Sequence, residues 1–100
     1  MSIDQSLFLE FCISLAISPK RLVIDIGGGS TEFVIGKNAN PLVMESVFVG
    51  CIKISKDFFP NGKINATGFS KAVFFSRKEI QVITSSFKSL GWDITYGCSG

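Results

Sequence analysis

The stretch Leu22-Val-Ile-Asp-Ile-Gly-Gly-Gly-Ser-Thr-Glu-Phe-Val-Ile-Gly36 decides how the rest of this chain is interpreted. The apolar run before its three glycines and the apolar run after Glu32 each have the length of a short β-strand. Glycines between two such runs are typical of a turn. The stretch therefore predicts a strand, a glycine turn and a second strand that is antiparallel to the first.

The turn has the chemistry of a phosphate site. Glycine can adopt positive φ and lets the backbone approach a ligand closely, and successive backbone N–H groups in such a turn can form a concave anion site. Ser30 and Thr31 add hydroxyl donors. Asp25 and Glu32 would repel phosphate unless a divalent cation lies between, and their hard oxygen atoms suit Mg²⁺. The plainer alternative is a hairpin turn without a ligand, and the two carboxylates favour the phosphate site.

Three other glycine-loop motifs do not fit this stretch. A phosphate loop of the Walker type needs Gly-Lys-Ser/Thr, but Gly36-Lys37 is followed by Asn38. A dinucleotide-binding fingerprint counted from Gly27 would need glycine where Glu32 stands. A nucleophile elbow around Ser30 would need a closing glycine at the same position.

The segment Asp25-Ile-Gly-Gly-Gly-Ser-Thr-Glu32 resembles the signature of the exopolyphosphatase/guanosine-pentaphosphate phosphohydrolase (Ppx/GppA) family. The resemblance implies an α/β fold of the actin, sugar-kinase and Hsp70 group, with a ribonuclease H-like motif. It also implies an incomplete domain over residues 20–100, preceded by an atypical N-terminal segment over residues 1–19. The likeness continues in order through Gly50-Cys-Ile-Lys-Ile, Phe58-Phe-Pro-Asn-Gly, Ala72, Arg77, Gly91-Trp92 and Gly97-Cys-Ser-Gly100.

The resemblance also assigns site residues. Asp25 and Glu32 would hold Mg²⁺ or its waters. The phosphate chain would be bound by two loops, whose residues are Gly27, Gly28, Gly29, Ser30 and Thr31 in the first and Ser99 and Gly100 in the second.

No catalytic residue is assigned, because the catalytic glutamate of the family falls near residues 1–4, where this sequence has no Glu. Intact members also carry an earlier domain. We therefore expect a fragment that lacks its N-terminal domain and is inactive alone.

The resemblance implies that the parent protein is a phosphoanhydride hydrolase acting on inorganic polyphosphate or guanosine pentaphosphate. One alternative is a remnant that binds phosphate or nucleotide without catalysis. Another is half of a sugar-kinase or Hsp70-type ATPase.

The composition argues against several other classes of protein and of functional site. The net charge of +2 is too small to favour nucleic acid or an anionic membrane. No apolar run reaches the roughly 18 residues of a membrane-spanning helix, so we expect a cytoplasmic protein. Three widely spaced cysteines favour neither disulfides nor zinc, and the absence of histidine excludes a Ser-His or Cys-His pair. The oligomeric state is left open.

The remaining segments predict a mixed sheet with one long crossover helix. A short amphipathic helix is expected within residues 7–17 and a third strand over residues 42–55, followed by a loop over residues 57–68. Apolar residues at three- and four-residue steps predict a helix over residues 69–90, with Ser76 as an alternative point of interruption. A last strand over residues 92–96 would lead into a glycine turn over residues 97–100. Cys51 and Cys98 are expected to be small buried residues.

Overall fold

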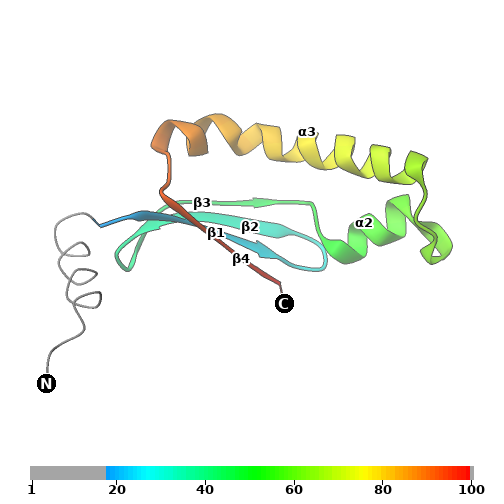
Figure 1. The fold of residues 1–100 in the computed structure, drawn as a ribbon, viewed down its shortest axis with the longest axis horizontal. Helices are drawn as coiled ribbons and strands as arrows, with labels where there is room; N and C mark the ends of the chain where they lie inside the picture. The colour runs from blue at the N-terminus through cyan, green and yellow to red at the C-terminus, as the bar shows by residue number, and fades with distance from the viewer. Residues whose placement is uncertain (1–17, 100) are drawn as a thin grey trace, which may run out of the picture.

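The computed structural model describes residues 18–99. Four strands form one sheet: β1 (Lys20–Ile26), β2 (Thr31–Lys37), β3 (Asn40–Val47) and β4 (Ile94–Ser99). Between β3 and β4 the chain forms the helix α2 (Cys51–Phe58), the 3-10 turn η1 (Pro60–Gly62) and the long helix α3 (Ala66–Leu90). Figure 1 shows α3 lying along one face of the sheet and α2 beginning beside the β1–β2 turn. The helix predicted within residues 7–17 lies outside the described residues.

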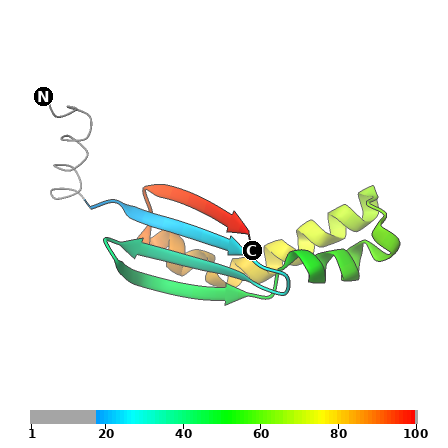
Figure 2. The same ribbon diagram turned by 90° about the horizontal axis from the view of Figure 1, so that it is seen from below.

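The sheet has the strand order β3-β2-β1-β4 (Figure 2). β1 and β2 are antiparallel, as predicted, and β2 and β3 are also antiparallel. The crossover through α3 returns the chain to the other edge, where β4 pairs with β1 in parallel. The predicted mixed α/β sheet with one long crossover helix is thus confirmed. β3 and β4 run in the same direction, as predicted, but they lie at opposite edges.

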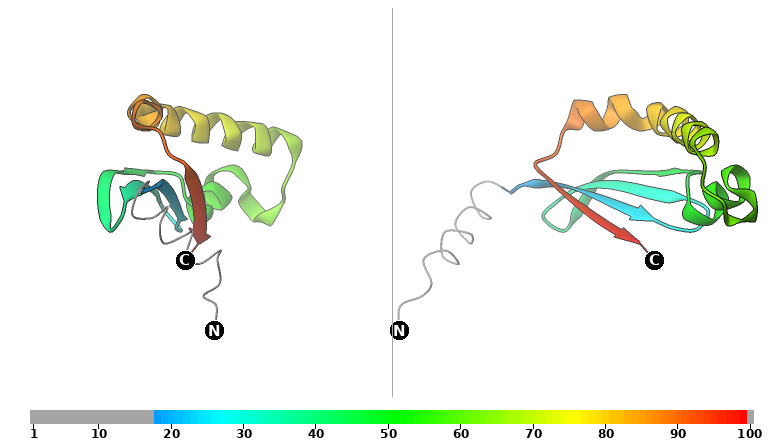
Figure 3. Two further views of the ribbon diagram at one scale, coloured as in Figure 1. Left: turned by 60° about the vertical axis from the view of Figure 1, so that its left-hand side comes forward. Right: turned by 45° about the vertical axis from the view of Figure 1, so that its right-hand side comes forward.

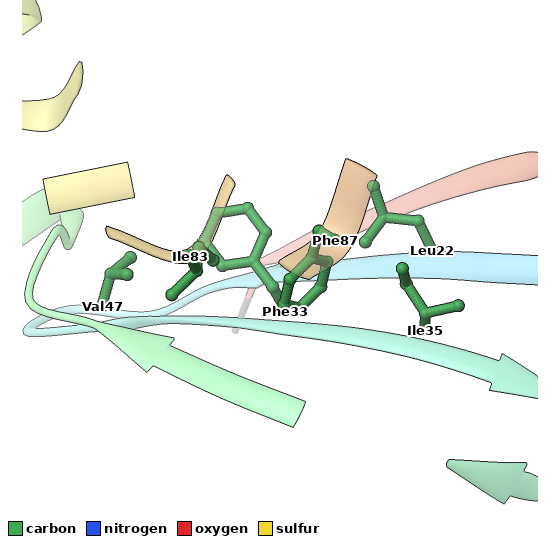
Figure 4. Packing of buried hydrophobic residues seen from close by; sticks show 6 residues of the cluster. All are labelled: Leu22, Phe33, Ile35, Val47, Ile83 and Phe87. Carbon is green, nitrogen blue, oxygen red and sulfur yellow. The ribbon is translucent and has the colours of Figure 1, made fainter. Parts of the chain in front are cut away.

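The core lies between α3 and one face of the sheet. Alternate residues of each strand point toward the helix, because successive side chains of a strand point to opposite faces. Ile35 is fully buried, and the ring of Phe33 meets the ring of Phe87 edge to face at 6.2 Å. Figure 4 shows the cluster, which consists of Leu22, Phe33, Ile35, Val47, Ile83 and Phe87. The opposite face of the sheet carries no helix in the described part of the chain (Figure 3).

The expected strand over residues 42–55 is wrong in its second half. β3 ends at Val47, and Cys51–Phe58 is helical. The helix begins where Gly50 meets the β1–β2 turn, because the first N–H groups of α2 bond to backbone carbonyl groups of that turn. This contact joins residues far apart in the sequence, so a local pattern could not reveal it.

Two helix boundaries and one strand also differ from expectation. The expected loop over residues 57–68 contains the end of α2, η1 and the start of α3. α3 begins at Ala66 because the side chain of Asn65 accepts a hydrogen bond from the Gly68 N–H at 2.7 Å, and it runs uninterrupted past Ser76. β4 extends to Ser99, so residues 97–99 are strand and not a turn. None of the helices within residues 18–99 is long and apolar enough to span a bilayer.

Candidate phosphate and metal site

One polar row crosses the sheet on the face opposite α3. It consists of one residue from each strand: Ser46 of β3, Glu32 of β2, Asp25 of β1 and Cys98 of β4. Glu32 is the direct cross-strand partner of both Asp25 and Ser46, and Asp25 is also the partner of Cys98. Cross-strand partners point to the same face of a sheet. Asp25 and Glu32, predicted from the sequence to act together, are therefore brought side by side.

The two carboxylates are held differently. Oε1 of Glu32 accepts a hydrogen bond from Ser30 Oγ at 2.9 Å and another from Ser46 Oγ at 3.3 Å. These two hydroxyl groups fix the orientation of the Glu32 side chain. Nothing in the sequence pattern identified Ser46, because its position beside Glu32 depends on the register of β3.

The Asp25 carboxylate has the Cys98 thiol as its neighbour. Desolvation, the negative charge of Asp25 and a hydrogen bond to its carboxylate together raise the pKa of the Cys98 thiol. The thiol is therefore kept protonated and remains a donor toward Asp25. Cys98 and Cys51 are both exposed, so the expectation that they are buried is wrong.

Two of the three glycines of the turn have close neighbours. None of Gly27, Gly28 and Gly29 has a positive φ, so the freedom of glycine to adopt left-handed conformations is not used here. A Cβ atom on Gly28 would lie 2.9 Å from Cδ1 of Ile52, and one on Gly27 would lie 3.0 Å from the Ser30 carbonyl oxygen. Gly29 has nothing within 4 Å of the position of a Cβ atom. The turn is therefore tightly packed against α2 on one side and open at Gly29.

The turn leaves several backbone N–H groups without a partner. The Gly27 N–H donates to the Ser30 carbonyl at 2.9 Å and closes the turn. Within residues 18–99, the N–H groups of Gly28, Gly29 and Ser30 donate no hydrogen bond to another residue. Unpartnered amides at a turn, beside a pair of carboxylates, are the features expected of a site for an anion with its cation.

Two of the predicted phosphate ligands have other surroundings in the structure, and a third cannot be placed. Thr31 is buried, and its hydroxyl donates to the carbonyl oxygen of Val49. Ser99 is the last residue of β4 and pairs with Ile26 at the end of β1 that leads into the turn. Gly100 lies outside the described residues. The roles assigned to these residues from the resemblance stay predictions.

The oxygen atoms of the polar row fit a hard divalent cation. Mg²⁺ is usually bound by one or two carboxylates and completes its octahedron with waters and phosphate oxygens. Asp25 and Glu32 supply that number. No cluster of three His, Cys, Asp or Glu side chains suited to a metal ion occurs within residues 18–99, so Asp25 and Glu32 would hold the cation together with waters or phosphate oxygens.

An apolar cavity of about 370 Å³ lies on the other side of the turn. It is lined mainly by aliphatic side chains of the sheet, α2 and α3, among them Ile24, Ile54 and Ile80. Neither Asp25 nor Glu32 lines it. A phosphate chain would meet mainly apolar side chains in this cavity, which favours the polar row and the exposed side of the turn as the candidate site.

Comparison with known proteins shows the family of this chain. Residues 7–100 match the model of the Ppx/GppA phosphatase family. The chain belongs to this family. The resemblance seen in the sequence is thereby confirmed, and the match decides against a sugar-kinase or Hsp70-type ATPase as the family of this chain.

Individual members of the Ppx/GppA family show how far the similarity extends. A Haemophilus influenzae protein named as a candidate exopolyphosphatase is 34% identical over 96 residues, which cover 96% of this chain and 30% of that protein. A guanosine-5'-triphosphate,3'-diphosphate pyrophosphatase of Vibrio vulnificus is 37% identical over 83% of this chain and 17% of its own length. The solved structure of the Aquifex aeolicus PPX-GPPA enzyme superposes with a TM-score of 0.68 at 27% identity, covering 93% of this chain and 29% of that one.

These matches confirm the fold class, a partial α/β domain of the Ppx/GppA type. The chain spans less than a third of the length of each of these three relatives. The activity and substrates of a whole Ppx/GppA protein are therefore taken up as proposals. The division into residues 1–19 and 20–100 stays a prediction.

Proposed function

We propose that this chain carries the part of a Ppx/GppA phosphatase that binds Mg²⁺ and phosphate. In the complete protein this site would serve the hydrolysis of phosphoanhydride bonds in inorganic polyphosphate or guanosine pentaphosphate. The observation that carries the proposal is the direct pairing of Asp25 with Glu32 at the end of β1, immediately before a turn with three unpartnered amides.

The residues have separate roles in this proposal. Asp25 and Glu32 would hold the cation, whose charge would offset that of the phosphate groups and of the two carboxylates. The amides of Gly28, Gly29 and Ser30 would donate to phosphate oxygens. The Ser30 hydroxyl, which already bonds to Glu32, would link the metal side of the site to the phosphate side.

The relatives of this chain do not favour one of the two substrates over the other. Proteins named for exopolyphosphatase activity and proteins named as guanosine-5'-triphosphate,3'-diphosphate pyrophosphatases are both similar to this chain. Both substrates present a run of phosphate groups, and the turn has donors only for that common part. The proposal therefore names the phosphoanhydride chain as the group that is bound here.

Binding without hydrolysis is the second candidate. It is favoured by the absence of Glu from residues 1–4, where the family resemblance places the catalytic glutamate. Within residues 18–99 the two carboxylates of the polar row are both assigned to the cation, which leaves neither to orient an attacking water.

The test uses the 100-residue chain with Mg²⁺. Binding of tripolyphosphate is followed by calorimetry, and phosphate release from long-chain polyphosphate is followed in parallel with Glu32→Ala. Binding without release shows a phosphate site that is inactive in this chain alone, which is the result that both candidates expect. Release that is lost in Glu32→Ala supports hydrolysis by this chain. Failure of the unmodified chain to bind tripolyphosphate contradicts both.

A further inference from the structure

The N-terminal turn of α2 rests on the carbonyl side of the glycine turn. The N–H of Cys51 donates to the Gly27 carbonyl at 3.0 Å, and the N–H of Ile52 donates to the Gly28 carbonyl at 2.9 Å. The N–H of Lys53 also reaches the Gly28 carbonyl, at 3.1 Å. The first N–H groups of a helix have no acceptor within the helix. Here three of them donate to two carbonyl groups of the glycine turn.

These hydrogen bonds also fix the direction of the N–H groups that share a peptide group with the two carbonyls. No described peptide bond is cis, and in a trans peptide the C=O and N–H groups point in opposite directions. Because the Gly27 carbonyl points at α2, the N–H of Gly28 points away from it. The N–H of Gly29 points away from α2 for the same reason. Both are among the unpartnered amides of the candidate site.

Gly50 makes this contact sterically feasible. A Cβ atom at this position would lie 2.3 Å from the Gly28 carbonyl oxygen and 2.6 Å from the Gly29 nitrogen. Both neighbours are backbone atoms, so no side-chain rotation could relieve the overlap. Any residue other than glycine would push α2 off the turn.

We infer that Gly50 and the first turn of α2 are positioning elements for phosphate binding, since they orient the Gly28 and Gly29 amides toward the ligand. This inference rests on the proposed function of the turn. It adds that the site depends on α2, a helix whose N-terminal turn touches no part of the proposed ligand. Hydrogen bonds in series polarise one another, so each α2 donor also strengthens the amide on the far side of the same peptide group.

The coupling acts in both directions. If the α2 bonds strengthen the turn amides, a ligand on those amides must strengthen the α2 bonds by the same free energy. Tripolyphosphate with Mg²⁺ should therefore slow hydrogen exchange at the amides of Cys51, Ile52 and Lys53, although these amides lie on the side of the turn away from the ligand. Binding also stabilises the folded chain as a whole, so a role of α2 in folding alone would slow exchange at these three amides no more than at the amides of α3.

Hydrogen exchange is measured by NMR on the full chain, with and without tripolyphosphate and Mg²⁺, and with Mg²⁺ alone as reference. Affinity is measured by calorimetry for Gly50→Ala and for Gly36→Ala. The second variant adds the same methyl group in β2, where the nearest heavy atom is 3.4 Å away. We expect Gly50→Ala to weaken binding about tenfold, which corresponds to the loss of one charge-assisted hydrogen bond. Gly36→Ala should bind as the unmodified chain does.

A second pair of variants removes one donor without changing a glycine. Cys51 is the first residue of α2, where proline is well tolerated. Cys51→Pro replaces the N–H that bonds to the Gly27 carbonyl by a ring carbon, which removes the donor and also crowds that carbonyl. Cys51→Ala keeps the N–H as the matched control. We expect Cys51→Pro to weaken tripolyphosphate binding severalfold relative to Cys51→Ala while α2 remains helical.

The inference is overturned if the unmodified chain binds tripolyphosphate but exchange at Cys51, Ile52 and Lys53 slows no more than exchange at the amides of α3. It is also overturned if a folded Cys51→Pro variant binds as tightly as Cys51→Ala. Absence of binding by the unmodified chain overturns the proposed function itself and this inference with it, so the two failures can be told apart. The exchange measurement needs no variant, which keeps the test decisive if Gly50→Ala does not fold.

Discussion

Asp25 and Glu32 face each other directly across β1 and β2, so two negative charges occupy one cross-strand pair. Like charges in this position are destabilising. The two residues on their other sides, Cys98 and Ser46, carry no charge that would offset them. A bound cation would turn this repulsion into attraction, and this supports the assignment of the pair to Mg²⁺.

Asp25→Asn should therefore change stability in opposite directions with and without Mg²⁺. In EDTA the variant should be more stable than the unmodified chain by about 0.2–1 kcal/mol, because the repulsion is removed. The increase in Tm that millimolar Mg²⁺ should give the unmodified chain should be lost in the variant. Thermal melts followed by circular dichroism measure both effects.

Asp57→Asn is the control for that experiment. Asp57 lies on α2, where it pairs with Lys53 at 2.9 Å, away from the polar row. It should keep the full response to Mg²⁺. An equal loss of the response in both variants would show that Mg²⁺ acts through general charge and not through the Asp25–Glu32 pair.

The reactivity of Cys98 should depend on Asp25. Because Asp25 contributes to raising the pKa of the Cys98 thiol, the thiolate fraction at a given pH is lower than it would be without that carboxylate. In metal-free buffer near neutral pH, Asp25→Asn should lower this pKa and speed alkylation of Cys98 by iodoacetamide. Peptide mass spectrometry separates Cys98 from Cys12 and Cys51, and alkylation of Cys51 serves as the internal reference. An unchanged ratio of the two rates would contradict the contact.

The hydroxyl group of Thr31 should contribute to the stability of the fold. Thr31→Val keeps the shape of the buried side chain but leaves the Val49 carbonyl without this donor. The expected loss in the free energy of unfolding is about 1–3 kcal/mol, measured by urea denaturation. Thr95→Val, at an exposed position of β4, should change stability by less than about 0.5 kcal/mol. Equal stability of the two variants would show that the buried hydroxyl contributes nothing.

Asn65 should be required at the start of α3. Its side chain accepts the Gly68 N–H, and Asn65→Ala should cost about 1 kcal/mol of stability. Asn65→Asp keeps an acceptor at the same position and should restore most of it. If Asn65→Asp were as unstable as Asn65→Ala in urea denaturation, the cap would not be the cause.

Local sequence patterns predicted the elements whose conformation is indicated by their own residues. The hairpin of β1 and β2 follows from two apolar runs around three glycines. The body of α3 follows from apolar residues at helical steps, and Gly91 ends it with a φ of 72°. Asn65 was available as a cap signal and would have placed the start of α3 correctly. The resemblance to Ppx/GppA proteins rests on the same residues and gave the fold class.

The same patterns failed wherever a distant contact decides the conformation. Residues 51–55 alternate in a way that suits a strand, yet they form a helix because their N–H groups find acceptors at Gly27 and Gly28. Residues 97–99 contain a glycine typical of a turn, yet they extend β4 because β1 offers a parallel partner. Cys98 is exposed because β4 is an edge strand within the described residues.

The hairpin, the crossover helix and the pairing of Asp25 with Glu32 could be predicted from the sequence, because each depends on residues that are close in the chain. The family could be predicted as well, because short motifs recur in order along residues 25–100. The places of Ser46 and Cys98 beside that pair, and the contact of α2 with the glycine turn, follow only from the three-dimensional fold. Strand register and the approach of Gly50 to Gly28 bring together residues far apart in sequence, and hydrogen bonds between such residues leave no periodic pattern in the chain.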